Sequence, residues 1–239
     1  MHAHESHRLR LLAFDTSTEF LHVAVQRGQG AAPLEHSGAG GAQASRTLIP
    51  AVQDLLARAG LRPADLDAIA FGRGPGSFTG LRTACSVAQG LAFGARVPVL
   101  GVDTLLAVAE DARHREGVER VVAVLDARMD EVYSACYLRD GGCWVQQGES
   151  SLGAPEAVRV PQGFFLAGNA LTAYGARLPP AAARIDAMPT AAALLRLAPA
   201  LIADGQAVPP AQAAPLYIRD KVAQTTAERA ASRAATIAS

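Results

Sequence analysis

The sequence predicts an α/β protein of two lobes, each built on a mixed β-sheet with flanking helices. Its 239 residues are about the length of two compact domains. Half of the residues are hydrophobic and 18% are charged, which favours packed cores over a disordered chain. Strand-like and helix-like segments alternate in both halves, and neighbouring strands joined by short polar turns indicate antiparallel pairs beside the helices.

The first half begins with a predicted β-hairpin. The apolar run 11–14 and the run 20–26 flank a short polar cluster, as two paired strands flank a turn. The Gly/Ala/Ser-rich stretch 37–45 is predicted as a loop. Apolar residues at helical spacing follow, at Leu48, Val52, Leu55, Leu56 and Ala59, and they predict a helix that packs on the sheet and ends at Gly60. The remaining predictions are a strand at 66–71, a helix at 77–94 and a strand at 97–102.

The second half repeats this mixture of elements. Its predicted helices cover 105–115 and 191–202, and its predicted strands cover 121–125, 132–138, 143–147 and 164–167, with an extended segment at 216–219. We expect an N-terminal lobe over 9–103 and a C-terminal lobe over 104–220. Residues 1–8 and 221–239 lack an apolar stripe, and we expect tails there that folding does not require.

Composition restricts the function classes. The 22 basic and 22 acidic residues give a net charge of zero, so any nucleic-acid role is expected to need a partner protein. Three cysteines without CxxC spacing argue against disulfides and zinc and fit a reducing cytosol. No apolar run approaches the roughly 20 residues of a membrane span, and the first residues lack an apolar signal core. We therefore expect a cytoplasmic protein.

The segment FGRGPGSFTGLR at 71–82 contains four glycines between a predicted strand and a predicted helix. Such a turn can aim backbone N–H groups at a phosphate. The lysine of a P-loop is missing, however, and the GxGxxG spacing ends in Thr79. Tight packing around glycine is the favoured interpretation. Ser77 fits a helix N-cap better than a nucleophile, because Thr79 stands where the G-x-S-x-G pattern needs glycine.

Two polar turns are candidate sites. The first, Asp15-Thr16-Ser17-Thr18, could hold Mg²⁺ and phosphate oxygens, or its side chains could simply close a hairpin. The second joins Asp126-Ala127-Arg128 to Glu131-Val132-Tyr133, where a strand-end site and a surface ion pair are both possible. Neither choice follows from the residues alone.

No metal site is predicted. His2, His4 and His7 lie in the expected N-terminal tail, and no H-x-x-x-H or H-E-x-x-H pattern occurs. A different pattern is a row of small residues at four-residue spacing in the second predicted helix: Ala84, Ala88 and Ala92. This row would let another helix approach closely, either from a partner chain or from within the lobe.

These segments together resemble the TsaB family. The resemblance rests on AFDTST at 13–18, FGRGPGSFTGLR with AQGLAFG at 88–94, and LDARMDEVY at 125–133, with a weaker echo in PLYIR at 215–219. It implies a two-lobed fold of the actin-like, sugar-kinase and Hsp70 (ASKH) type. It also implies a non-catalytic partner of the transferase TsaD in threonylcarbamoyladenosine (t6A) biosynthesis on tRNA.

The resemblance further implies a heterodimer with TsaD, contact with the ATPase TsaE through that pair, a homodimer in isolation, and tRNA bound only within the complex. Its subunit interface uses the first two helices, so the row Ala84, Ala88 and Ala92 is the candidate contact surface. No catalytic residue, cofactor or metal is expected. A vestigial nucleotide or phosphate contact is the alternative role for Asp15, Thr16, Ser17, Gly74 and Gly76.

One departure supports a non-catalytic role. TsaD carries an H-x-x-x-H metal pair early in its first lobe, whereas QASRTLIP at 43–50 begins the equivalent helix here with Ala44 and contains no histidine. The rival interpretations are an ATP-dependent small-molecule kinase of the same fold and a peptidase. Against the kinase interpretation, 125–128 does not form a convincing second phosphate loop. Against the peptidase interpretation, the sequence has neither metal ligands nor a nucleophile elbow.

Overall fold

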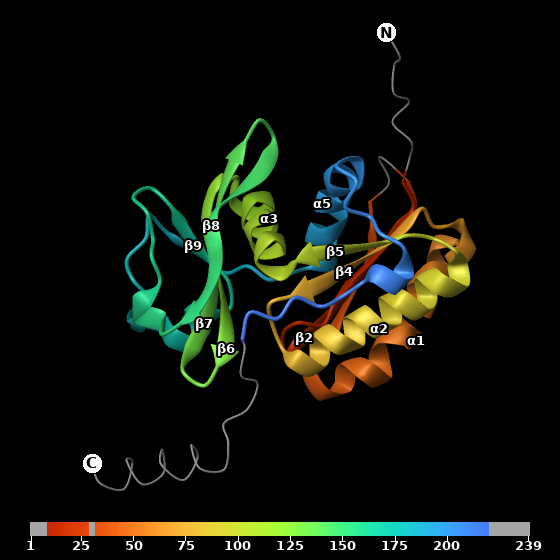
Figure 1. Cartoon of the computed structure of the whole chain (residues 1–239), viewed down its shortest axis with the longest axis horizontal. Coiled ribbons are helices and arrows are strands. Elements are labelled where there is room, and N and C mark those ends of the chain that lie inside the picture. Colours follow the sequence, from red (N-terminus) through yellow and green to blue (C-terminus); the bar gives the residue numbers. More distant parts are fainter. Residues whose placement is uncertain (1–8, 29–31, 220–239) are drawn as a thin grey trace, which may run out of the picture.

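The computed structural model of the protein describes residues 9–28 and 32–219, and within these ranges the chain forms two lobes (Figure 1). Each lobe contains a five-stranded mixed sheet with flanking helices. The predicted α/β class and two-lobed ASKH-type architecture are thereby confirmed. The expected tails at 1–8 and 221–239 lie outside the described residues.

The first sheet and the helices on one of its faces lie between residues 9 and 103. In chain order the elements are β1 (Leu11–Asp15), β2 (Phe20–Gln26), β3 (Leu34–Ala39), α1 (Ala44–Ala59), β4 (Ala68–Gly74), α2 (Phe78–Ala95) and β5 (Val99–Asp103), with short 3-10 helices at Gly41–Gln43 and Pro63–Asp65. The strand order is β3-β2-β1-β4-β5. The first three strands are antiparallel, and β4 and β5 continue the sheet in parallel to β1.

The second sheet repeats this topology. Its elements are α3 (Thr104–Glu116), β6 (Arg120–Arg128), β7 (Glu131–Asp140), β8 (Cys143–Gly153), β9 (Phe165–Ala167), α4 (Ala170–Tyr174), β10 (Arg184–Ile185) and α5 (Ala191–Ala203), with 3-10 helices at Pro155–Ala157, Gly175–Arg177 and Pro210–Gln212. The order β10-β9-β6-β7-β8 again combines an antiparallel meander with two parallel strands. The duplication suggested by the sequence is therefore present in the strand order.

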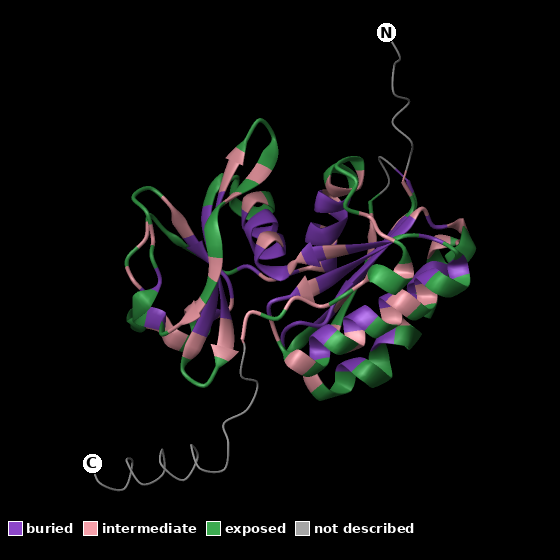
Figure 2. Ribbon diagram, viewed as in Figure 1, coloured by how far each residue is buried: buried purple, intermediate pink, exposed green. Residues whose placement is uncertain are grey.

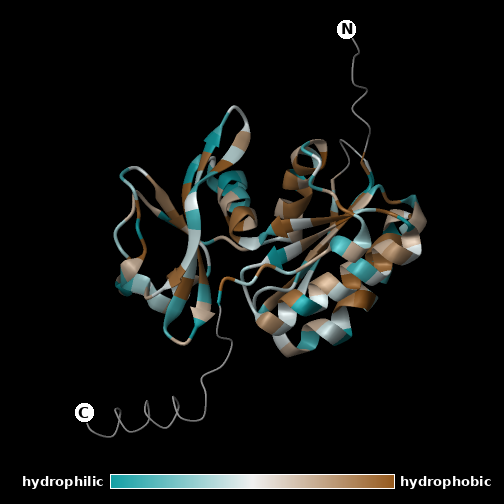
Figure 3. Ribbon diagram, viewed as in Figure 1, coloured by the Kyte–Doolittle hydropathy of each residue, from teal (hydrophilic) through white to brown (hydrophobic). Residues whose placement is uncertain are grey.

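Alternation along β1 divides the first lobe into two cores. Leu12 and Phe14 face α1 and α2, whereas Leu11 and Ala13 face the opposite side, which α5 covers. Small side chains on that second face, such as Ala68 and Ala70, leave room for the apolar helix α5 (Figure 3). In the view of Figure 2, the buried sides of α1 and α2 face the sheet and their outer sides are exposed.

The chain crosses between the lobes three times, at α3, at α5 and again at 213–219. Helix α3 packs on the second sheet, and α5, which follows β10, packs on the first. Further along the chain, Val208 pairs with Val99 at the edge of the first sheet. The predicted C-terminal lobe at 104–220 thus includes a segment that completes the N-terminal lobe.

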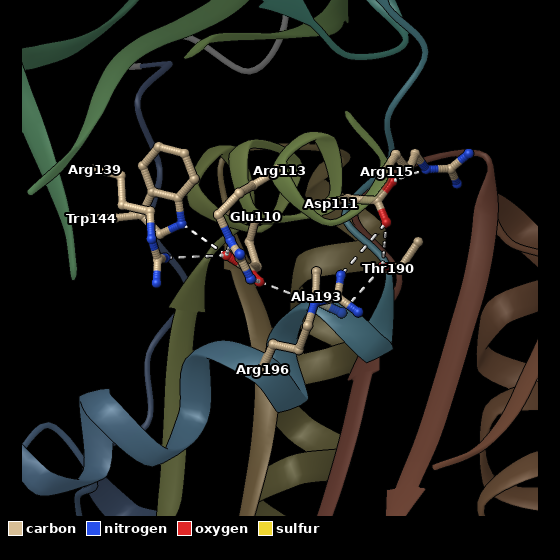
Figure 4. A network of polar contacts seen from close by, with 9 residues as sticks. All are labelled: Glu110, Asp111, Arg113, Arg115, Arg139, Trp144, Thr190, Ala193 and Arg196. Atoms are coloured by element: carbon tan, nitrogen blue, oxygen red, sulfur yellow. Dashed lines mark hydrogen bonds and ion pairs between the residues drawn. The ribbon is translucent and has the colours of Figure 1, made fainter. Parts of the chain in front are cut away.

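A buried polar cluster joins α3 to α5 and β8 (Figure 4). Glu110 accepts hydrogen bonds from Arg113 Nε at 2.9 Å, Trp144 Nε1 at 2.9 Å and Arg196 Nε at 3.0 Å. Burial alone would raise the pKa of Glu110, but the hydrogen bonds from Arg113 and Trp144 and the charges of Arg113 and Arg196 together outweigh it, and the pKa is lowered. This cluster fastens the helix of one lobe to the helix that covers the other.

Most predicted elements are confirmed, with informative exceptions. The first helix ends at Gly60, whose φ of 68° is the left-handed cap conformation. The predicted loop at 37–45 is wrong, because its first residues belong to β3 and its last to α1. Ser77 stands at the N-cap of α2 as expected, but its side chain caps no backbone N–H. Among the described helices, none combines the length and hydropathy that crossing a bilayer requires.

Candidate functional site

A pocket of about 360 Å³ lies where the two lobes meet. It is lined by residues 17–19, 75–78, 125–129 and 216–219, together with Gly41, Leu81, Tyr133 and Asn169. The polar turn, the glycine segment, the β6–β7 hairpin and the PLYIR segment all contribute to this lining. Segments that are distant in the sequence therefore converge on one site, as the strand ends of a duplicated α/β fold allow.

The polar turn after β1 is closed by its own side chains. Asp15 Oδ1 accepts hydrogen bonds from the backbone N–H of Ser17 at 2.9 Å and from its hydroxyl at 2.7 Å. Thr16 Oγ1 donates to the carbonyl oxygen of Gly80 at 2.7 Å. Asp15 and Thr16 have no exposed surface. The hairpin-closing interpretation of this turn therefore describes Asp15, whereas the Thr16 hydroxyl bonds to α2 outside the turn. Only residues 17–19 of the turn region reach the pocket.

The glycine segment provides space for that turn. A Cβ at Gly72 would lie 1.7 Å from Asp15 Oδ2, and one at Gly76 would lie 2.6 Å from the carbonyl oxygen of Ser17. That same oxygen accepts a hydrogen bond from the backbone N–H of Ser77 at 2.7 Å. The favoured interpretation, tight packing around glycine, is thus supported, and the chain that packs there is the polar turn.

Asp15 carries an unusual carboxyl group. Complete burial raises its pKa from 3.8 to about 6, although hydrogen bonds from Ser17 act in the opposite direction. Its Oδ2 atom has no hydrogen-bond partner within the described structure. The described residues contain no group of three or more His, Cys, Asp and Glu side chains placed to hold a metal ion. Asp15 is therefore a buried carboxyl group with one oxygen bonded to Ser17 and the other without a partner among the described residues.

On the other lobe, Asp126 organises the end of β6. Its Oδ1 accepts hydrogen bonds from Arg128 N at 2.8 Å and the Tyr174 hydroxyl at 2.9 Å, and its Oδ2 pairs with Arg128 Nη1 at 2.9 Å. Burial and the bond to Asp126 raise the pKa of Tyr174 to about 12. The Asp126–Arg128 ion pair lies within one strand end, so it is not the pair across the hairpin that the sequence also allowed.

The pocket's two guanidinium groups are both engaged by carboxylates. Arg128 pairs with Asp126, and Arg219 pairs with Glu131 at 2.7 Å. Asn169 links the lobes across the pocket, since its Nδ2 donates to Glu19 Oε2 at 3.3 Å. These pairings leave little uncompensated positive charge for a polyphosphate.

The candidate vestigial contacts divide into two groups. Ser17 and Gly76 line the pocket, whereas Asp15, Thr16 and Gly74 do not. Sequence reasoning missed Glu19, Asn169 and Tyr217 as lining residues. The PLYIR segment is the one sequence signal, a weak family echo, that could have directed attention to Tyr217.

The small-residue row of α2 faces inward. Ala84, Ala88 and Ala92 are all fully buried and belong to the core between α2 and the first sheet. The prediction that these three residues contact a partner chain is therefore wrong, because a partner cannot reach side chains that the lobe itself covers. The four-residue spacing correctly identified one face of the helix, but it did not indicate whether that face packs on the chain's own sheet or on a partner chain.

The outer surfaces of α1 and α2 carry different residues. Phe93 on α2 is 81% exposed and Ile49 on α1 is 43% exposed. A Cβ at Gly90 or Gly94 on α2 would meet no neighbouring atom within 4 Å, so the helix backbone is open to close approach there. Figure 1 shows the two helices lying together on the outside of the first lobe. This surface replaces the alanine row as the candidate contact.

Comparisons with known proteins give a consistent identification. Residues 36–158, roughly half of the chain, match the family model described as TsaD, tRNA N6-adenosine threonylcarbamoyltransferase. The Escherichia coli tRNA threonylcarbamoyladenosine biosynthesis protein TsaB is 37% identical over 234 residues, covering 90% of this chain and 96% of that protein. The TsaB protein of Haemophilus influenzae is 46% identical over 135 residues, or 55% of each chain.

A solved structure agrees with these sequence matches. YeaZ from Pseudomonas aeruginosa has a TM-score of 0.81 and 42% sequence identity, and the match covers 88% of this chain and all of that one. The similarity to E. coli TsaB covers 90% of this chain and therefore includes most of both lobes. The chain belongs to the TsaB family of tRNA threonylcarbamoyladenosine biosynthesis proteins.

Proposed function

We propose that this chain is a non-catalytic, cytoplasmic subunit that supports TsaD. The reaction is catalysed by TsaD, which transfers a threonylcarbamoyl group to N6 of adenosine 37 in tRNAs that read codons beginning with A. The chain forms a heterodimer with TsaD, meets the ATPase TsaE through that pair, and contacts tRNA only within the complex. Family membership is the observation that carries the proposal.

The absence of a histidine pair in α1 supports a non-catalytic role. The helix begins at Ala44 and contains no histidine, whereas the family resemblance places a metal-binding H-x-x-x-H pair in TsaD. The chain therefore lacks the residues that would let it repeat the chemistry of its partner by the same route.

The character of the pocket argues against the kinase alternative. A kinase of this fold would need free donors for the phosphates of ATP. Here both guanidinium groups of the pocket are already paired with carboxylates, and Asp15 and Thr16 are buried. We retain Ser17 and Gly76 as the remaining positions at which a vestigial anion contact could form.

The outer surface of α1 and α2 is the proposed site for TsaD. Phe93 is a large, 81% exposed aromatic side chain, the kind of residue that anchors protein interfaces. Gly90 and Gly94 would let a partner helix pack closely beside it. The same surface would join two copies of this chain when TsaD is absent, so the homodimer and the heterodimer would exclude each other.

Co-elution tests the proposal. The chain is mixed with TsaD, and the mixture is separated by size-exclusion chromatography with light scattering. We expect a 1:1 complex, and we expect the homodimer peak of the isolated chain to disappear as TsaD is added. Co-elution that leaves the homodimer intact would place TsaD elsewhere, and a lack of any complex would contradict the proposed partnership.

A further inference from the structure

Residues 213–219 run from the first lobe to the second without forming a helix or strand. They follow the 3-10 helix Pro210–Gln212 and contain the whole PLYIR segment. Their last four residues form one wall of the interlobe pocket. We call residues 213–219 the strap.

The beginning of the strap is fixed to the first lobe. The backbone N–H of Leu216 donates to the carbonyl oxygen of Arg73 at 2.7 Å, and Gln89 Nε2 donates to the carbonyl oxygen of Ala213 at 3.0 Å. Gly74 allows this approach, because a Cβ there would lie 2.4 Å from the carbonyl oxygen of Leu216. These contacts attach the strap to both β4 and α2.

Tyr217 adds an aromatic attachment at the start of α2. Its ring lies 5.3 Å from that of Phe78, centroid to centroid, and its hydroxyl accepts a hydrogen bond from Arg82 Nε at 3.1 Å. Arg82 also lies over the Phe78 ring, 3.8 Å from its centroid. The three side chains form a small stack at the edge of the pocket.

The end of the strap is fixed to the second lobe by Arg219. Its Nη2 atom donates to the carbonyl oxygen of Ala127 at 3.0 Å and lies 2.7 Å from Glu131 Oε2. Its Nη1 atom lies 3.1 Å from Met129 Sδ. The Arg219 side chain is only 15% exposed, whereas Glu131 is 36% exposed, so the guanidinium group is covered by the hairpin that it contacts. One guanidinium group thus holds both strands of the β6–β7 hairpin and its turn.

The hairpin turn needs such support. Arg128, Met129 and Asp130 have φ values of 60°, 56° and 64°, which is the left-handed region that residues with a Cβ rarely occupy. Each such residue costs about 1–2 kcal/mol. A turn with three of them in succession keeps this shape only when surrounding contacts hold it, and Arg219 contributes contacts on either side of the turn.

We propose that the strap fastens the β6–β7 turn to the first lobe and so sets the width of the interlobe pocket, with Arg219 as the positioning residue. When Arg219 releases the turn, the strap keeps only its contacts with the first lobe, is less constrained, and the pocket widens. The polar cluster around Glu110 joins the lobes at a separate place, so release of the strap loosens the pocket without separating the lobes. The proposal is independent of the partner proposed above.

Hydrogen exchange of the full chain, followed by mass spectrometry, tests this role. In Arg219→Gln we expect amide exchange to rise at least tenfold in 125–133 and in 213–218, while the strands of both sheets outside these segments keep their rates. Arg184→Gln is the matched control, because Arg184 also donates to carbonyl oxygens, at 2.6 Å to Gly175 and 2.8 Å to Leu178, but entirely within the second lobe. This control is expected to leave 125–133 and 213–218 unchanged.

Two further variants keep the test decisive. The first is the double variant Arg219→Glu with Glu131→Arg, which exchanges the two charges. It should restore at least half of the protection from exchange that 125–133 loses in Arg219→Gln. The second is Tyr217→Ser, at a 43% exposed position, which should raise amide exchange in 213–218. It replaces Arg219→Gln as the test if that variant does not fold. Unchanged exchange at 125–133 in Arg219→Gln, equal acceleration throughout the chain, or unchanged protection of 213–218 in Tyr217→Ser would each overturn the proposal.

Discussion

Thr16 and Gly80, 64 residues apart in the sequence, lie in direct contact at the start of α2. The Thr16 hydroxyl donates to the Gly80 carbonyl oxygen at 2.7 Å, and the Thr16 carbonyl oxygen lies 1.8 Å from the position that a Cβ on residue 80 would occupy. The helix can therefore reach the polar turn only because residue 80 has no side chain. The glycine-rich segment of the sequence serves this contact.

Gly80→Ala is expected to destabilise the protein by about 1–3 kcal/mol, since the new methyl group would overlap a backbone oxygen. Gly90→Ala, in the same helix but with open space around it, is expected to stabilise by about 1 kcal/mol through helix propensity. Urea unfolding of both variants measures the difference. Equal effects at the two positions would show that the Thr16 contact does not require glycine.

The buried carboxyl of Asp15 predicts a pH dependence of stability. Because its folded pKa of about 6 is above the unfolded value of 3.8, the folded state binds more protons in this window, and stability falls as pH rises from about 4 to about 6. Asp15→Asn removes this effect and keeps an acceptor for Ser17. Relative to the parent chain, the variant is expected to gain about 2–3 kcal/mol between pH 4 and pH 7.5.

Unfolding free energies of the two chains, measured side by side across this range, provide the test. Taking the difference between the chains removes the contributions of all other titrating groups. A stability difference that does not change with pH would mean that folding does not raise the pKa of Asp15.

Glu110 is expected to contribute to the joint between the lobes. Glu110→Gln removes the charge that Arg113 and Arg196 share, and we expect a loss of about 2 kcal/mol, reduced from the cost of a fully buried pair because the arginines are partly exposed. The fluorescence of Trp144, the single tryptophan of the chain, should change as well. Glu149→Gln on the exposed surface of β8 is the control and should alter neither quantity.

The partner surface gives a prediction with opposite outcomes at two positions of α2. Phe93→Asp is expected to leave folding within about 0.5 kcal/mol of the parent and to weaken TsaD binding at least tenfold, because the side chain is exposed and apolar. Ala88→Arg is expected to unfold the chain, because no space exists for a charged side chain in that core. Circular dichroism and titration calorimetry with TsaD measure both effects.

Val145→Asp is the control for that experiment. Val145 is 45% exposed and lies on β8 of the other lobe, so the same kind of substitution there should not affect TsaD binding. Normal binding by the Phe93 variant would place the interface away from the C-terminal end of α2.

Much of the fold was predictable because the buried strands and helices carry periodic apolar residues. The stripe Leu48, Val52, Leu55 and Leu56 predicted the packing face of α1, and Gly60 predicted its end. Strand β3 was missed, because an exposed edge strand of sequence LEHSGA has no apolar alternation to reveal it. Strand β10 was missed because it is too short to show a periodic pattern.

The site was less predictable, since it depends on contacts between distant segments. The sequence indicated the polar turn and the glycine segment separately, but nothing in either indicated that a Cβ at Gly72 would overlap Asp15. The row Ala84, Ala88 and Ala92 illustrates a second limit. Small residues at helical spacing mark a closely packed face whether the neighbour is the chain's own sheet or another protein.

The formation of t6A on tRNA, with each protein omitted in turn, tests the central claim most directly. The reaction contains threonylcarbamoyl-adenylate, unmodified tRNA, TsaD, TsaE, ATP and metal, and nucleoside analysis measures the product. We predict no t6A from this chain without TsaD, and a rate with TsaD that rises with the concentration of this chain and saturates near one equivalent. Detectable t6A from the chain alone, or a TsaD rate that does not depend on it, would contradict the account.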